Sequence, residues 1–115
     1  MVERGEIYYV DWPSGRGAEQ EGTRPARIIQ NDVGNQFSST TIVAAISTSR
    51  RTSYPFQVYV ESSESRLPRD SVVKCEWIQT IDQSRLGRLV GDLPDKKLAE
   101  VDVALHRSLG LEFYV

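Results

Sequence analysis

The sequence is poor in the side chains that build metal centres and disulfides. It holds a single cysteine, Cys75, and a single histidine, His106. An internal disulfide is therefore excluded, and neither residue has a partner at metal-ligand spacing. Acid-base catalysis by a pair of histidines is excluded as well. We expect a protein of the reducing cytoplasm that holds no metal and no cofactor.

Long apolar runs and export signals are also lacking. No stretch reaches the roughly 18 consecutive apolar residues that a membrane-spanning helix needs. The first residues, Met-Val-Glu-Arg-Gly-Glu, contain no basic region followed by an apolar one, as a signal peptide would. We therefore expect no association with a membrane.

The chain carries little net charge and none of the common catalytic motifs. Its formal charge is −2 at pH 7, which excludes a protein that coats nucleic acid through bulk positive charge. Residues 16–88 nevertheless hold ten basic against eight acidic residues, so this central segment can face a phosphate. A Walker loop, a dinucleotide-binding glycine fingerprint and a Gly-x-Ser-x-Gly motif are all missing.

What the sequence does contain is enough for one folded domain. With 115 residues and a mass of 13.0 kDa, it has the length of a single hydrophobic core, and we expect one domain over residues 1–115. Hydrophobic residues make up 39% and charged residues 26%, the balance of an ordinary globular protein.

Short β-branched and aromatic segments predict a mainly β protein. The expected strands are 6–11, 25–30, 40–47, 56–61, 71–81 and 86–90. The uncharged run 40–47 predicts a central strand covered on both faces, and the alternation in 56–61 predicts a half-buried one. Residues 13–22, 31–35, 62–68 and 82–84 are expected to be loops or turns.

A helix is expected only near the end of the chain. Apolar residues recur at helical spacing after Pro94, and Gly110 is expected to cap the helix. The apolar positions are Leu98, Val101, Leu105 and Leu109. Short strands followed by one amphipathic helix predict a strongly bent sheet or partly open barrel with the helix packed on it.

Few side chains are candidates for chemistry on residue type alone. Cys75 is expected to be a small buried side chain rather than a nucleophile, and His106 a surface or packing residue. Trp77 is equally compatible with a place in the core and with a face for base stacking.

Arg24 stands where a glycine-rich segment joins a strand, so its forked guanidinium is placed to bind a phosphate at two points. Pairing with Glu19 or Glu21 is the alternative. The hydroxyls of Ser47 and Thr48, at the end of an expected strand, are the other candidates.

Seven motifs, in one order and spacing, resemble the MazF/PemK-like toxins of bacterial type II toxin-antitoxin systems. They are Arg-Gly-Glu-Ile-Tyr at 4–8, Gly-Ala-Glu-Gln-x-Gly-x-Arg-Pro at 17–25, Gln-Asn-Asp-x-x-Asn at 30–35, Ile-Val-Ala-Ala-Ile-Ser at 42–47, Asp-Ser-Val at 70–72, Glu-Trp-Ile-Gln-Thr-Ile-Asp at 76–82 and Leu-Gly-Leu at 109–111. The resemblance spans nearly the whole chain. It implies a compact SH3-like barrel that forms a homodimer, cuts single-stranded mRNA at specific sequences without a metal, and is blocked by a cognate antitoxin protein.

The resemblance also implies roles for particular residues. It sets the family's arginine at Arg24 and its catalytic threonine at Ser47, which keeps the hydroxyl and loses one methyl group. Thr48 points to the opposite face of the strand. The general base stays open between Arg24 and Glu19, because arginine is a poor base. Trp77 stands where relatives often have glutamine.

A groove for RNA is expected around these residues. Its RNA-binding residues are expected to be Gln20, Asn31, Asp32, Arg50, Arg51 and Trp77. Positive charge is expected from Arg24, Arg27, Arg50, Arg51 and Arg69.

RNA supplies its own nucleophile, the 2′-hydroxyl, so the expected products are a 2′,3′-cyclic phosphate and a 5′-hydroxyl. Two alternatives remain at this stage: a CcdB-like gyrase inhibitor that acts by binding protein, and an inactive homologue kept as an interaction module.

Overall fold

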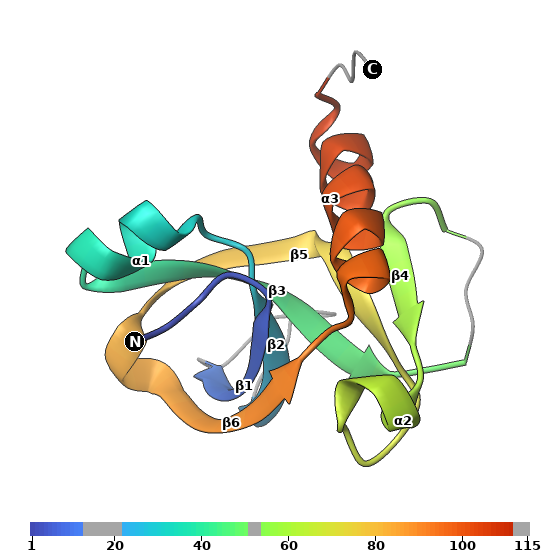
Figure 1. Cartoon of the computed structure of the whole chain (residues 1–115), viewed down its shortest axis with the longest axis horizontal. Coiled ribbons are helices and arrows are strands. Elements are labelled where there is room, and N and C mark those ends of the chain that lie inside the picture. The colour runs from blue at the N-terminus through green and yellow to red at the C-terminus, as the bar shows by residue number, and fades with distance from the viewer. Residues whose placement is uncertain (13–21, 51–53, 112–115) are drawn as a thin grey trace.

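The computed structural model describes residues 1–12, 22–50 and 54–111, and Figure 1 shows them as one curved sheet with a helix standing on it. The strands are β1 (Glu6–Trp12), β2 (Gly22–Ile28), β3 (Thr40–Thr48), β4 (Gln57–Val60), β5 (Ser71–Asp82) and β6 (Leu86–Asp92). The helices are α1 (Asp32–Phe37), α2 (Ser62–Ser65), the 3-10 turn η1 (Gln83–Arg85) and α3 (Asp95–Leu109). The expected mainly β fold with a C-terminal helix is confirmed.

The strands form a six-stranded antiparallel sheet in the order β4-β5-β3-β2-β1-β6. β3 pairs with both β2 and β5, and four of its consecutive residues, 43–46, are buried. The prediction of a central strand covered on both faces is therefore confirmed. Figure 1 shows β5 and β6 curving around β1 and β2, which gives the partly open barrel.

The two faces of the sheet bury separate apolar clusters. The first cluster lies beneath α3 and includes Ile46, Val73 and Val101. The second lies on the other face and includes Val10, Ile28 and further residues of β1, β2 and β3. Because side chains alternate along a strand, neighbouring residues of β3 contribute to different clusters.

The predicted turn at 31–35 is wrong, because the chain forms the short helix α1 there. Asn31 caps this helix: its Oδ1 accepts the backbone N–H of Gly34 at 2.8 Å. Asn35 is 3% exposed, and its Oδ1 accepts the hydroxyl of Thr41 at 2.7 Å. Contacts with the sheet thus stabilise a helix too short and too polar to be recognised from apolar periodicity.

The expected loop at 62–68 likewise contains a helical turn, α2. Glu61 and Glu64 form a capping box at the start of this turn: the side chain of each residue accepts the backbone N–H of the other. Such a box satisfies N–H groups that a helix start leaves unpaired.

The C-terminal helix forms where the sequence predicts it. α3 ends at Gly110, which adopts the left-handed conformation with φ 67°. At its other end it packs closely on the N-terminal segment: a Cβ on Gly5, where φ is 99°, would lie 3.1 Å from Leu98. Arg4 binds Asp102 of α3 at 2.6 Å. Within the described ranges, no helix is both long and apolar enough to cross a bilayer.

Arg27 lies in the interior, which corrects its placement in a basic groove. Its side chain is fully buried, on the face of β2 that packs toward α3. None of its three side-chain nitrogens has a hydrogen-bond partner among the described residues. Burial, and after it the charge of Arg4, lowers the pKa of Arg27 to about 10, while Asp102 acts in the opposite direction.

Replacing Arg27 by methionine should stabilise the protein. A lowered pKa means that burial disfavours the charged form, so the charge costs stability at neutral pH and the cost is relieved as the pH rises above about 10. Methionine has a similar length and no charge to desolvate. We expect Arg27→Met to raise the free energy of unfolding at pH 7 by about 1 kcal/mol, measured by urea denaturation. Lower stability than wild type would mean that the guanidinium is bound to a group that compensates its charge.

Candidate active site

Arg24 and Ser47 are brought together by the register of two neighbouring strands. The ladder between β2 and β3 ends at the pair Ala26↔Ala45. Continuing this antiparallel register by two residues on each strand sets Arg24 opposite Ser47. Opposed residues of an antiparallel pair project from the same face, with Cβ atoms about 4.5–5.5 Å apart where the strands stay paired. Pro25, which has no N–H to donate, stands just beyond the last pair.

Each of the two residues also pairs with a strand on its other side. Arg24 pairs with Val10 of β1, and Ser47 pairs with Val72 of β5. Arg24 is exposed and Ser47 is half-buried. A guanidinium and a hydroxyl therefore flank the point where the β2–β3 ladder ends, and both are hydrogen-bond donors suited to phosphate oxygens.

This site lies on the face of the sheet opposite α3. Positions two apart on a strand share a face, so Arg24 projects with Ala26, and Ser47 with Ala45. Both alanines belong to the second apolar cluster. Thr48, the neighbouring hydroxyl, alternates to the other face and is exposed. The structure thus separates the two candidate hydroxyls.

Trp77 and Lys74 lie beside this pair. β5 carries an irregularity opposite Ala44 and Ala45, so that Lys74 pairs with Ala45 on the face of Ser47. The Lys74 ammonium lies 5.7 Å from the centre of the Trp77 ring, which is half-buried against the second cluster. The ring packs partly in the core and is partly accessible, and its role in base stacking stays a prediction.

Lys74 is the residue that sequence reasoning missed. The alternation of the strand sets it on the opposite face from the buried Cys75. Cys75 itself is fully buried, and burial raises the pKa of its thiol to about 12. The expectation that this thiol is not a nucleophile fits its burial.

A carboxylate at the same end of the sheet is used for structure. Asp70 accepts the backbone N–H of Ser62 at 2.8 Å and the hydroxyl of Tyr59 at 2.9 Å. These hydrogen bonds lower the pKa of Asp70. A carboxylate stabilised in its charged form is a weak base, so Asp70 is unsuited to proton abstraction.

The other predicted site residues are not all near Arg24. Arg50 follows the end of β3 closely and is exposed. Asn31 and Asp32 lie beyond the far end of β2, whose last residue is about 13 Å from Arg24 at the rise of an extended strand. Their RNA-binding role stays a prediction. Glu19, Gln20 and Arg51 lie outside the described residues.

Asn31 and Asp32 have structural partners in this position. Asn31 caps α1, and Asp32 accepts the backbone N–H of Arg4 at 2.7 Å. Among the residues with described positions, no cluster of three or more histidine, cysteine, aspartate or glutamate side chains is arranged to hold a metal ion.

Substitutions at Asn31 separate its two possible roles. Asn31→Ala should lower the free energy of unfolding by about 1 kcal/mol, because the cap acceptor is lost. Asn31→Asp retains an acceptor oxygen and should keep wild-type stability. Thermal denaturation measures both. If Asn31→Asp keeps stability but loses affinity for RNA, the amide contacts RNA; if both variants unfold like wild type, the cap is unimportant.

Comparisons with known proteins agree along the whole chain. A family model described as the PemK-like, MazF-like toxin of type II toxin-antitoxin systems matches residues 3–109. The curated endoribonuclease MazF of Staphylococcus saprophyticus is 46% identical over 113 residues, covering 96% of this chain and 93% of its own.

Solved structures agree as well. An endoribonuclease of a mycobacterial species, in complex with its cognate antitoxin, superposes with a TM-score of 0.82 at 24% identity and covers 99% of this chain and 100% of its own. MazF of Deinococcus radiodurans gives a TM-score of 0.77 at 25% identity, with coverage of 95% and 96%. At this identity the first of these supports the fold alone.

Proposed function

The chain belongs to the PemK-like, MazF-like toxins of type II toxin-antitoxin systems, and we propose that it is the endoribonuclease toxin of such a system. Its substrate is single-stranded mRNA, which it cuts at specific sequences without a metal ion. The endoribonuclease relative, 46% identical over most of both chains, favours this function over a CcdB-like gyrase inhibitor. The observation that supports the proposal is the register of β2 and β3, which sets Arg24 opposite Ser47 when it is continued two residues beyond the pair Ala26↔Ala45.

The geometry supports cleavage by the RNA's own 2′-hydroxyl. When this oxygen attacks the adjacent phosphorus, the oxygens of the phosphorane gain negative charge and the 5′-oxygen leaves. The guanidinium of Arg24 neutralises that charge, and the hydroxyl of Ser47 donates a hydrogen bond to a non-bridging oxygen. The products are a 2′,3′-cyclic phosphate and a 5′-hydroxyl. Glu19 and Arg24 remain the two candidates for the general base.

The surroundings of the pair fit a single strand of RNA. Trp77 offers a partly accessible ring for stacking, and Lys74 sets a positive charge beside it. Arg50 adds a further cation near the end of β3. These residues give a local positive surface on a chain whose net charge is −2. Binding should therefore weaken as the salt concentration rises.

Ribonuclease assays in EDTA test the catalytic pair. Ser47→Ala should lower the cleavage rate about 100- to 1,000-fold because a transition-state donor is lost, and Arg24→Ala should lower it at least as much. Ser47→Thr should retain activity because it keeps the hydroxyl. Cut ends are mapped on a long unstructured RNA, and their phosphate chemistry is determined.

Thr48→Ala is the matched control, because Thr48 is the next residue and projects to the other face. It should cleave at the wild-type rate. Equal loss in Thr48→Ala and Ser47→Ala would contradict the assignment of Ser47. Absence of cutting by the wild-type protein on several unrelated RNAs would contradict the nuclease function itself.

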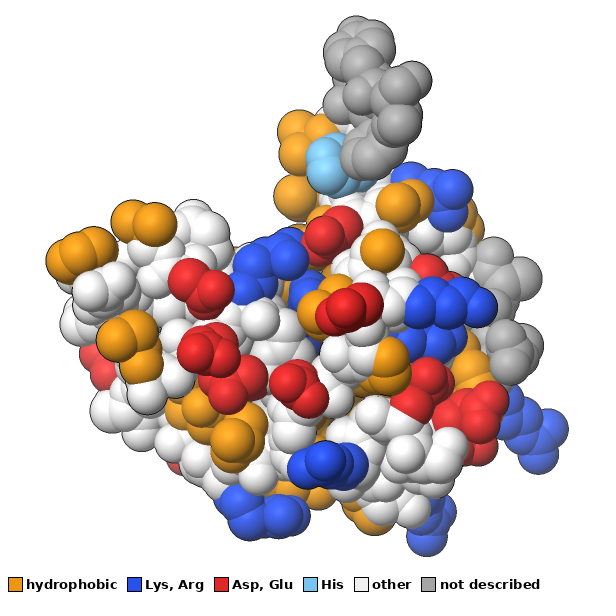
Figure 2. Space-filling view, in the orientation of Figure 1, with side chains coloured by type: hydrophobic (Ala, Val, Ile, Leu, Met, Phe, Trp, Pro, Cys, Tyr) orange, Lys and Arg blue, Asp and Glu red, His pale blue; other side chains and the backbone are white. Residues whose placement is uncertain are grey.

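A homodimer and a cognate antitoxin in the cytoplasm complete the proposed function. Exposed apolar side chains stand on α1 and at the end of α3: Val33, Phe37 and Leu109 are 69%, 79% and 57% exposed. Figure 2 shows two separate groups of apolar side chains, one over α1 and one near the end of α3. Exposed apolar side chains of this size are typical of surfaces covered by another chain.

Light scattering tests the dimer. The wild-type protein should have twice the mass of the 13.0 kDa chain at micromolar concentration. Phe37→Ser combined with Leu109→Ser should shift it to the monomer, because the apolar contact is lost. Tyr54→Ser, at an exposed aromatic residue that belongs to neither α1 nor α3, is the control. A wild-type monomer would overturn the dimer without bearing on the nuclease.

A further inference from the structure

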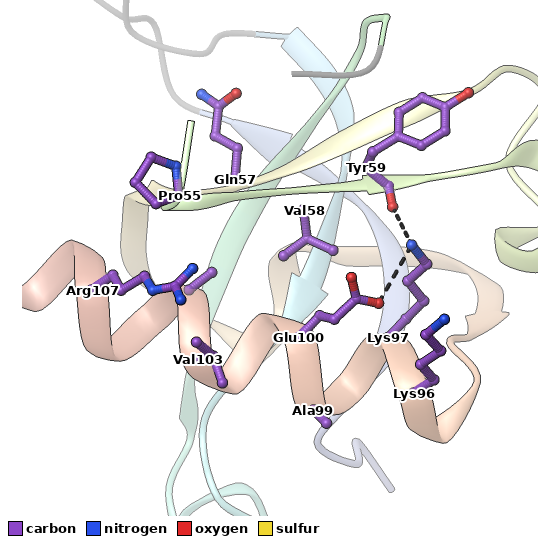
Figure 3. A pocket seen from close by; sticks show the side chains of 11 residues that line it. Pro55, Gln57, Val58, Tyr59, Lys96, Lys97, Ala99, Glu100, Val103 and Arg107 are labelled. Carbon is purple, nitrogen blue, oxygen red and sulfur yellow. Dashed lines mark hydrogen bonds and ion pairs between the residues drawn. The ribbon is translucent and has the colours of Figure 1, made fainter. Parts of the chain in front are cut away.

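A second concave surface lies between α3 and β4, on the face of the sheet away from Arg24 and Ser47. This groove has a volume of about 570 Å³. Figure 3 shows Val58 of β4 pointing toward α3, whereas the side chains of Gln57 and Tyr59 point away from it. β4 is an edge strand of the sheet, so the groove runs along the rim of the molecule.

The helix side of the groove combines a positive rim with an apolar floor. The apolar lining residues include Val103 and Ala104 of α3 and Val58 of β4. The charged lining residues are Lys96, Lys97, Glu100 and Arg107. Three cations and one carboxylate give a local charge of +2, against −2 for the whole chain.

The cations differ in how they are held. The ammonium of Lys97 donates to the carbonyl oxygen of Tyr59 at 2.9 Å and lies 3.5 Å from Glu100, so its charge is partly balanced. Lys96 and Arg107 are exposed and make no ion pair with another described residue. Their charges are therefore available to a ligand at the two ends of the groove.

The dimensions and the lining favour a peptide over RNA. Lys96 and Arg107 are eleven residues apart, which is about 16 Å along a helix axis. An extended peptide spans this distance with about five residues at 3.3 Å each. The floor is aliphatic, and the aromatic residue of the lining, Tyr59, turns its ring away from α3 and binds Asp70. Bases would find no stacking surface here.

We propose that this groove docks an acidic peptide segment of a partner protein. The segment lies extended along α3, with acidic side chains at both ends toward Lys96 and Arg107 and a short apolar centre on Val58 and Val103. Because this groove and Arg24 lie on opposite faces of the sheet, a bound peptide leaves the RNA-cleaving face open.

Fluorescence anisotropy tests the proposal on the full-length protein. The probe is a fluorescein-labelled peptide, Glu-Glu-Leu-Ser-Val-Glu-Glu. We expect saturable binding that Lys96→Glu combined with Arg107→Glu weakens at least tenfold, because two attractive charges become repulsive. Arg85→Glu combined with Arg88→Glu makes the same change in net charge at exposed positions outside the groove and should bind as wild type.

A second probe and a second variant separate docking from general attraction of anions. The same peptide with serine in place of leucine and valine should bind at least tenfold more weakly, because the apolar floor is no longer filled. Val103→Ala should weaken the first peptide and leave the serine peptide unaffected. Equal binding of both peptides, equal weakening by both charge-reversed variants, or no binding by wild type would each overturn the proposal.

RNA cleavage and mass, measured on the same variants, complete the test. The Lys96→Glu, Arg107→Glu protein should cut RNA at the wild-type rate and keep the wild-type mass. Loss of RNA affinity in this variant would assign the groove to RNA, and loss of the dimer would assign it to a second copy; either result would overturn peptide docking. Because the catalytic residues are intact in this variant, failure of peptide docking leaves the ribonuclease proposal standing.

Discussion

The register between β2 and β3 is the constraint on which the active site depends. A slip of one residue on either strand would turn Arg24 or Ser47 to the opposite face, since side chains alternate along a strand. The register is fixed on both faces at once. Ile28 and Val43 pair within the second apolar cluster, while Ala44, paired with Arg27, packs in the first. A slip would move side chains of each apolar cluster to the other face of the sheet. The packing of these two clusters therefore determines which side chains meet at the active site.

The sequence predicts the helices and strands whose apolar residues recur regularly. It does not predict those that are stabilised by contacts between distant segments. β3 and α3 are found because their apolar patterns are long and regular. α1 is six residues long and contains a glycine, and it is stabilised by a buried amide, Asn35, that binds Thr41 of the neighbouring strand. Only the family resemblance predicts that Arg24 and Ser47 lie near each other, because they are 23 positions apart in the sequence and nothing local specifies the register of their strands.

The alternation of side chains along a strand nonetheless predicts part of the site from the sequence. Arg24 and Arg27 are three positions apart on one strand and therefore project from opposite faces, so they cannot line one groove. The same rule separates Lys74 from buried Cys75 and sets it with Ala45 on the face of Ser47. Basic residues that are close together in a segment can lie on opposite faces of the sheet. The alternation of side chains along each strand predicts which of them share a face.

A chain with a net charge of −2 presents positive surfaces because many of its carboxylates are engaged by its own backbone. Asp32, Glu64, Asp70 and Asp82 each accept a backbone N–H at a helix start or turn. A carboxylate used in this way orders a connection between strands. Lys74 and Arg24 lie on one face of the sheet, and Lys96 and Arg107 lie on the other. The net charge of the sequence therefore says little about partners, whereas the structural use of each carboxylate determines which surfaces attract an anion.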